Sequence, residues 1–280
     1  MKPPPFDYHA PRDLGEALAM LAEVGADGKV LAGGQSLIPL LNMRIAAPRH
    51  LVDINRVAEL DTLTVEAGGV RVGALARHAR VERSGEAAAA QPLLRQALRL
   101  VAHPVIRNRG TVVGSLVHAD PSAEMPAVLA VLGGSIRLAR HGGGERDVPA
   151  AEFFTGPMES AIEPGELAVS AFFPALPPHT GTAFRELARR HGDYALAGVA
   201  AVVTRDGPAR VACIGVGPTP ITVDVTAEVA AGEWKAAAQA VRERTEPEDD
   251  IHATAAYRHH LVGVLAEQAL REAAREAAHA

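Results

Sequence analysis

The chain is poor in cysteine, in aromatic residues and in long apolar runs. Its 280 residues include one cysteine, and Phe, Trp and Tyr together make up 4%. A single cysteine excludes an internal disulfide, a zinc site built from cysteine pairs and an iron–sulfur cluster. Cys213 lies in an apolar run, which favours a buried structural thiol over a reactive one. Any redox chemistry must therefore depend on an organic cofactor.

Charge and hydropathy exclude further classes of function. A net charge of −5 gives no broad positive surface for nucleic acid or anionic lipid. No segment approaches the roughly 20 consecutive apolar residues of a membrane span, and residues 1–8 lack the apolar stretch of a signal peptide. We therefore expect a cytoplasmic protein with no nucleic-acid partner and no membrane span. A 280-residue chain with 48% apolar residues is long enough for two domains.

Two glycine-containing segments carry the strongest functional signal. Ala32-Gly33-Gly34-Gln35-Ser36 and Thr111-Val112-Val113-Gly114-Ser115 each combine glycine with a small hydroxyl residue, next to an apolar run. We expect a strand to turn at both places. Glycine permits φ > 0 and lets backbone N–H groups approach a ligand closely. Two such turns facing one another predict a site for two linked phosphates, as in a dinucleotide.

The apolar periodicity predicts alternating helices and strands before residue 140. We expect helices over 14–24 (capped by Asp13), within 36–44, over 81–102 with a break near Pro92, and over 121–132; strands over 29–32, 50–54 and 135–139; and a hairpin over 65–73. Taken by themselves, Asp120 and Glu124 are better explained by a well-capped helix start, with Pro121 at the first position, than by a functional role. No histidine or carboxylate cluster accompanies them, so no metal site is predicted.

The second part of the chain has a different composition. The stretch Phe172–Pro178 is typical of a domain boundary. Beyond it, residues 182–189, 195–204 and 209–216 predict a three-stranded antiparallel sheet, and residues 227–245 and 254–278 predict helices. These elements indicate a smaller α+β domain.

At this point several segments resemble a known family. Ala32–Leu37, Ile106–Thr111 and His118–Glu124 are similar to the FAD-binding medium subunit of molybdenum hydroxylases, the family of carbon monoxide dehydrogenase and xanthine dehydrogenase. Phe184–Arg190 and Ala255–Leu261 resemble its flavoprotein C-terminal domain. The resemblance implies an α+β chain: a two-lobed FAD-binding domain of the vanillyl-alcohol-oxidase/PCMH type over 1–175, with lobes of about 1–56 and 57–175, and a C-terminal domain over 176–280.

The resemblance also implies which residues hold the cofactor. The FAD is non-covalent, and no residue is assigned a catalytic or metal-binding role. By matching position, Ala32 to Leu37 and Thr111 to Ser115 would contact the diphosphate and ribityl chain; Asp120 and Glu124 would lie at the cofactor, with Glu124 bonded to the adenosine end; Leu167 would pack in the pocket; Arg185 and Tyr194 would lie near the flavin. Val113 stands where relatives commonly have glycine, which predicts backbone strain if φ is positive there.

The function implied by the resemblance is that of one component of a larger enzyme. A large subunit would bind the molybdenum cofactor and a small subunit two [2Fe–2S] clusters, in a dimer of heterotrimers. Electrons would pass from the clusters to FAD and then to an external acceptor. Two alternatives remain open: a free-standing FAD oxidoreductase of the same fold, and a non-catalytic assembly subunit whose flavin site has decayed at Val113.

Overall fold

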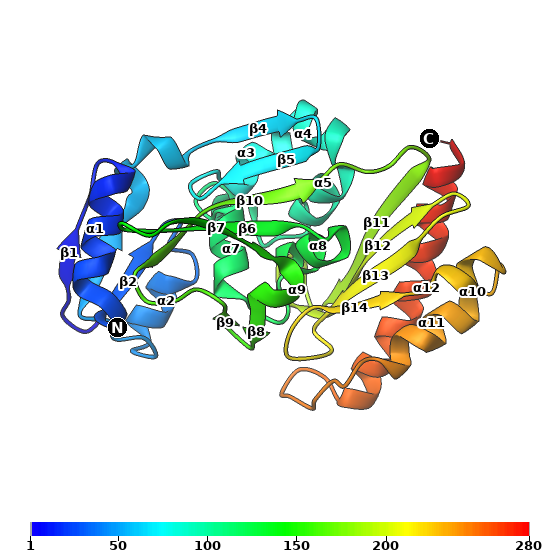
Figure 1. The fold of residues 1–280 in the computed structure, drawn as a ribbon. Helices are drawn as coiled ribbons and strands as arrows, with labels where there is room; N and C mark the ends of the chain where they lie inside the picture. The colour runs from blue at the N-terminus through cyan, green and yellow to red at the C-terminus, as the bar shows by residue number, and fades with distance from the viewer. Residues whose placement is uncertain (1, 280) are drawn as a thin grey trace.

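The computed structural model describes residues 2–279, and its sheets follow one another along the chain from a small N-terminal lobe to a C-terminal sheet backed by helices (Figure 1). The N-terminal lobe holds a parallel sheet in the order β1-β3-β2. Its strands are β1 (Asp7–His9), β2 (Gly28–Leu31) and β3 (His50–Asp53), with helices α1 (Leu14–Val24) and α2 (Leu37–Asn42). Asp13 caps α1 as predicted, because its side chain accepts the Glu16 N–H.

A five-stranded antiparallel sheet forms the middle of the molecule, in the order β4-β5-β10-β6-β7. Its strands are β4 (Leu63–Glu66), β5 (Gly69–Gly73), β6 (Ser135–Arg140), β7 (Gly144–Pro149) and β10 (Glu166–Pro174). The helices around it are α3 (His78–Arg83), α4 (Gly85–Ala90), α5 (Pro92–Leu98), α6 (Pro104–Arg107), α7 (Val112–His118), α8 (Glu124–Leu132) and α9 (Ala150–Phe153), and β8 (Phe154–Gly156) pairs with β9 (Glu159–Ser160). The predicted hairpin is confirmed as β4–β5, and the helical region 81–102 is divided into short helices.

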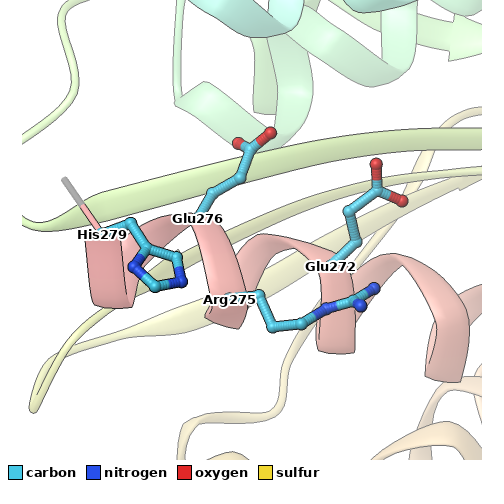
Figure 2. A pocket seen from close by; sticks show the side chains of 4 residues that line it. All are labelled: Glu272, Arg275, Glu276 and His279. Carbon is cyan, nitrogen blue, oxygen red and sulfur yellow. The ribbon is translucent and has the colours of Figure 1, made fainter.

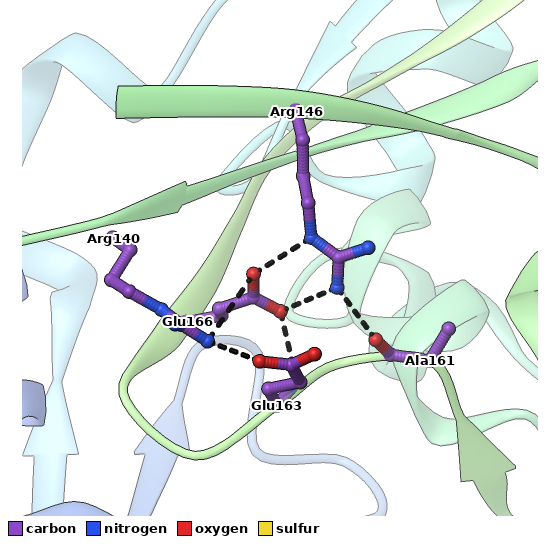
Figure 3. A network of polar contacts seen from close by, with 5 residues as sticks. All are labelled: Arg140, Arg146, Ala161, Glu163 and Glu166. Carbon is purple, nitrogen blue, oxygen red and sulfur yellow. Dashed lines mark hydrogen bonds and ion pairs between the residues drawn. The ribbon is translucent and has the colours of Figure 1, made fainter. Parts of the chain in front are cut away.

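A polar network fixes the start of the central strand β10 (Figure 3). The Arg146 guanidinium donates to both carboxylate oxygens of Glu166, at 2.8 Å each, and to the Ala161 carbonyl at 2.9 Å. The Glu163 N–H donates to the same carboxylate, whose side chain is 5% exposed. Burial alone would raise the pKa of Glu166, but these hydrogen bonds outweigh burial and hold its pKa below the ordinary value.

The C-terminal domain is an antiparallel sheet of four strands covered on one face by helices. The strands are β11 (Thr180–Ala188), β12 (Ala195–Thr204), β13 (Ala209–Ile214) and β14 (Ile221–Asp224), and the helices are α10 (Thr226–Ala230), α11 (Trp234–Glu243) and α12 (Ala255–His279). The predicted three-stranded sheet therefore lacked β14. Gly232, at φ 72°, lies between α10 and α11 and divides the single helix predicted over 227–245.

The two faces of this sheet have different neighbours. Cys213 and Val199 pack with α11 and α12 in one core, while Phe184 and Ile214 belong to the core shared with the middle sheet and α8. Burial raises the pKa of the Cys213 thiol to about 12, which agrees with a structural cysteine. β10 ends at Pro174 and β11 begins at Thr180, so residues 175–179 connect the two parts. Within residues 2–279, none of the helices has the length and apolar character needed to cross a membrane.

Candidate cofactor site

The structure brings the two glycine-containing segments into contact. A Cβ on Gly33 would lie 2.6 Å from the Arg109 carbonyl oxygen and 2.8 Å from the Gly110 Cα. Only glycine therefore allows the loop after β2 to lie this close to the residues before α7. Gly34 has φ 72°, in the left-handed region that favours glycine. The loop follows the carboxyl end of a parallel strand, where open sheets usually bind their ligands.

Two residues that the sequence analysis missed hold these loops together. The Asn55 side-chain amide donates to the Ala32 carbonyl at 2.8 Å. The Arg77 guanidinium donates to the Asn55 side-chain oxygen at 2.6 Å and to the Arg109 carbonyl at 2.7 Å. Partial burial, and then the charge of Arg109, lower the pKa of Arg77. The position of Asn55, two residues after the end of β3, was a signal available in the sequence.

The loop carries backbone donors that the chain itself does not use. No acceptor within residues 2–279 takes the N–H groups of Gly33, Gly34, Gln35 or Ser36, although the Gln35 side chain donates to the Gly33 carbonyl. Successive backbone N–H groups around glycine form a concave site for an anion. The free N–H groups of residues 33–36 therefore fit the diphosphate of a dinucleotide.

The second segment is the start of a helix, which corrects the expectation of a strand turn. Thr111 caps α7, because its hydroxyl accepts the Gly114 N–H at 3.0 Å. Val112 and Val113 are helical and buried, and Gly114 and Ser115 are half-buried. Val113 is not among the described residues with positive φ. The condition for strain at Val113 is therefore not met, since α7 gives this residue an ordinary helical backbone.

A second group of predicted residues lies beyond α7. Asp120 accepts the Ser122 N–H at 2.8 Å, and α8 begins at Glu124 rather than at Pro121, so Asp120 forms a turn instead of a helix cap. Glu124 is 9% exposed. Burial, followed by the charges of Glu186 and Asp120, raises its pKa to about 8. Tyr194 lies near Asp120 and Glu124. Partial desolvation, followed by the charges of these two residues, raises its pKa, although 66% of Tyr194 is exposed.

Two predicted residues lie apart from both groups. Leu167 is in β10, within the buried core of the middle sheet. Arg185 forms an ion pair with Glu272 of α12, with 2.6 Å between Nη2 and Oε2. Side chains alternate along a strand, so Arg185 faces the helices while its neighbour Glu186 faces α8. The structure therefore does not bring Arg185 to the other predicted residues.

Figure 2 shows a surface hollow near the end of α12, lined by Glu272, Arg275, Glu276 and His279. All four side chains come from one helix. Glu272 is paired with Arg185, and Glu276 accepts the Thr182 N–H at 3.1 Å. Both carboxylates of the hollow thus bind residues of β11 and hold α12 against that strand. None of the residues that line the hollow belongs to the glycine loops.

Comparisons with known proteins agree with this geometry. Residues 4–176 match the FAD binding domain in molybdopterin dehydrogenase, and residues 182–273 match the CO dehydrogenase flavoprotein C-terminal domain. The alpha subunit of the 6-hydroxypseudooxynicotine dehydrogenase complex of Paenarthrobacter nicotinovorans is 40% identical over 284 residues, covering 98% of this chain and 96% of the relative. The carbon monoxide dehydrogenase medium chain of Hydrogenophaga pseudoflava is 36% identical and covers 98% of both chains.

Solved structures show the same similarity. Carbon monoxide dehydrogenase from Hydrogenophaga pseudoflava superposes with a TM-score of 0.92 at 37% identity, covering 99% of both chains. Quinoline 2-oxidoreductase from Pseudomonas putida 86 gives 0.91 at 36% identity, with the same coverage. Fold and site thus define an FAD-dependent oxidoreductase subunit. The chain belongs to the family of FAD-binding medium subunits of molybdenum hydroxylases, which confirms the resemblance and the α+β fold class. FAD is its cofactor, and molybdenum and iron–sulfur centres belong to other subunits.

Proposed function

We propose that this chain is the electron-transfer subunit of a heteromeric molybdenum hydroxylase. It takes electrons from the iron–sulfur clusters of a small partner subunit and passes them to an external acceptor, while a large molybdopterin-binding subunit oxidises the substrate. The observation that carries the proposal is the contact of the Gly33 loop with residues 109–111, which leaves four successive backbone donors for a diphosphate. End-to-end similarity to medium subunits of such enzymes supports it.

The chain's own residues bind and orient the cofactor. When bound, FAD supplies the one- and two-electron chemistry that links metal clusters to a soluble acceptor. The N–H groups of Gly33 to Ser36 would hold the diphosphate. Asn55 and Arg77 keep the loops in place. The one thiol is buried with a pKa of about 12, so it supplies no thiolate at neutral pH.

We infer the assembly of this chain from the organisation of its relatives. One relative is named as a subunit of a dehydrogenase complex and another as the medium subunit of a hydroxylase, and for the present chain we propose a cytoplasmic dimer of heterotrimers. Purifying the tagged chain from its own cells tests it. Co-purification with two further chains, and with molybdenum, iron and FAD, is expected. A flavin-containing chain without partners would instead indicate a free-standing oxidoreductase, and partners without flavin would indicate an assembly subunit.

Substitution of Gly33 by valine tests the cofactor site itself. Its side chain would collide with the Arg109 carbonyl, where even a Cβ comes within 2.6 Å, so the loop must move away from residues 109–111. We expect Gly33→Val to purify without flavin and to ignore added FAD in an absorption titration.

The matched control is Gly85→Val at the start of α4, where a Cβ meets nothing within 4 Å. This variant should retain wild-type flavin content. Trp234, the single tryptophan, lies on α11 of the C-terminal domain, and its fluorescence should report an unchanged fold in both variants. Full flavin content in Gly33→Val would refute the diphosphate assignment.

A further inference from the structure

We propose that Asp53, held in place by Tyr8, is a positioning residue for the Gly33 loop. It acts through Asn55, whose side-chain amide it orients against the Ala32 carbonyl, so that the N–H groups of residues 33–36 stay turned toward the cofactor. The inference rests on the proposed function, because it takes the diphosphate of FAD to be the group that the Gly33 loop binds. It adds residues of β1 and β3, neither of which belongs to that loop.

The register of the N-terminal sheet places Asp53 between the two elements that it connects. β3 is the central strand, with β1 on one side and β2 on the other. Tyr8 is paired with Leu51, and Leu31 is paired with Asp53. Side chains alternate along each strand, so these four residues lie on one face of the sheet. Asp53 is the last residue of β3, and the Gly33 loop follows Leu31 directly, so the carboxylate lies between the Tyr8 side chain and the loop.

Both oxygens of the Asp53 carboxylate accept hydrogen bonds. Oδ2 accepts the Tyr8 hydroxyl at 2.6 Å. Oδ1 accepts the backbone N–H and the side-chain amide of Asn55, at 2.9 and 2.5 Å. Hydrogen bonds to a carboxylate are stronger than those between neutral groups. The bond to Asp53 also raises the pKa of Tyr8, so the hydroxyl group stays protonated and donates at neutral pH.

The Asn55 amide has different neighbours on its two sides. Its NH₂ group also donates to the Ala32 carbonyl at 2.8 Å, and its oxygen accepts from the Arg77 guanidinium at 2.6 Å. A rotated amide would direct its oxygen at the Ala32 carbonyl and the Asp53 carboxylate, which cannot donate. Its NH₂ group would then meet the Arg77 guanidinium, which cannot accept. Asp53 therefore favours the one orientation in which the amide holds the loop.

This network crosses from the N-terminal lobe to the middle of the molecule. Arg77 also donates to the Arg109 carbonyl at 2.7 Å, and residues 76–78 are paired with residues 110–112. The Arg109 carbonyl oxygen is the atom that a Cβ on Gly33 would approach to within 2.6 Å. Asn55 is exposed, so hydrogen bonds rather than burial fix its side chain. The contact between the loop and the segment that it faces thus depends on the carboxylate that orients Asn55.

FAD titration of the purified protein, together with any partners that accompany it, tests the proposal. We expect Asp53→Ala to weaken FAD binding about tenfold and Tyr8→Phe about threefold, since each removes a hydrogen bond to a charged group. Asp53→Asn should weaken it less than Asp53→Ala, because its amide oxygen can still accept from Asn55. In a chain that carries Asn55→Ala, Tyr8→Phe should have no further effect, because Tyr8 acts through that amide.

Asp7→Asn is the matched control. Asp7 precedes Tyr8 in β1, so its side chain lies on the opposite face of the sheet, where its carboxylate is 3.7 Å from the His50 ring. This variant should keep the wild-type affinity for FAD.

ADP and adenosine separate a positioning role from a general loss of structure, because ADP carries a diphosphate and adenosine has no phosphate. In competition with FAD, Asp53→Ala and Tyr8→Phe should weaken ADP binding by the same factors as FAD binding. The affinity for adenosine should not change in either variant. A chain whose fold is damaged would lose affinity for all three ligands.

The outcomes separate this inference from the proposed function. Wild-type FAD affinity in Asp53→Ala would overturn the inference and leave the proposed function intact. An equal loss from Tyr8→Phe with and without Asn55→Ala would also overturn it, since Tyr8 would then act independently of the amide. Equal losses of FAD and adenosine affinity would indicate a structural role instead. A wild-type protein that does not bind FAD would refute the proposed function as well.

Discussion

Residues near the cofactor loops are held by packing. Val113 is 2% exposed and packs into the core from the first turn of α7, next to the Thr111 cap. The Val113 side chain packs in the core of the FAD-binding domain, and Val113 is not among the described residues with positive φ. Valine at this position is therefore compatible with the close approach of Gly33 to residues 109–111.

Substitution of Val113 by alanine tests this interpretation. The variant removes two buried methyl groups, and we expect it to lower the free energy of unfolding by about 2 kcal/mol. FAD affinity, measured under conditions where the chain is folded, should be unchanged. Val105→Ala provides the control, because Val105 in α6 is 70% exposed and surface substitutions change stability by about 0.5 kcal/mol or less. A stable Val113→Ala chain with altered FAD affinity would instead show that Val113 contacts the cofactor.

The residues of the site differed in how well the sequence predicted them. The Gly33 loop was predictable because two glycines and a small hydroxyl residue directly follow a short apolar run. The helix at Thr111 was not predicted, because a strand turn was expected there, although Val112, Val113, Leu116 and Val117 have helical spacing after a hydroxyl cap. The position of Asn55 after β3 was visible in the sequence, but the partners of Asn55 and Arg77 were not, because these loops are distant in the chain and meet only in the folded protein.

The start of β10 is held by polar contacts. It is the central strand of the middle sheet, and its first residue, Glu166, accepts hydrogen bonds from Arg146 of β7 and from the Glu163 N–H. These contacts join the β6–β7 hairpin to the segment that precedes β10. A charged partner on a nearly buried carboxylate is worth more than an exposed ion pair.

Glu166→Gln is expected to lower the free energy of unfolding by about 2 kcal/mol at neutral pH. The amide cannot accept both guanidinium hydrogen bonds, and its NH₂ group faces donors. Since the folded pKa of Glu166 lies below its ordinary value, the carboxylate's contribution is present above the unfolded pKa and disappears as pH falls through the folded pKa. Denaturant titrations at neutral and acid pH measure both effects. Glu145→Gln, in an exposed pair of the same hairpin, is the control, and an equal loss in both variants would contradict the prediction.

Elements with strong local signals were predicted well, and those set by tertiary contacts were not. α1 has a cap, an apolar face and a terminal glycine, and all three are local. β14 is a four-residue strand that begins after Pro220 and pairs only at the edge of the sheet, so it has little periodicity of its own. The division between α10 and α11 depends on the left-handed Gly232, which a run of alanines around it obscures.

At the scale of the whole molecule, the junction between the two domains determines which side chains face the cofactor region. The sequence placed Arg185 there by resemblance, but strand alternation turns it toward α12 and presents Glu186 to α8. Which face of a strand meets which neighbour depends on how the domains dock. No local pattern around residues 184–188 contains that information, so this part of the site required the structure.

The same junction makes the stability of the cofactor-free chain depend on pH. Burial raises the pKa of Glu124 to about 8 and that of Glu186 to about 7, from an ordinary value of 4.5. The folded chain therefore keeps protons that the unfolded chain releases. Their stabilising effect is complete below pH 4.5 and is lost as pH rises through about 7 and 8. His78 changes the free energy of unfolding in the opposite direction. Burial lowers its pKa from 6.5 to about 4, so stability rises with pH between these two values and no longer changes through His78 above pH 6.5.

Above pH 6.5 the two glutamates dominate the pH dependence of stability. We expect the free energy of unfolding to fall by up to about 1.4 kcal/mol per pH unit for each glutamate that titrates. Urea denaturation of the cofactor-free chain at several pH values from roughly 6.5 to 9 measures the slope. The double variant Glu124→Gln/Glu186→Gln should flatten it, because neither amide titrates, and Glu272→Gln on the opposite sheet face should retain it. A double variant with the wild-type slope would show that the carboxyl groups of Glu124 and Glu186 are not the source of the pH dependence.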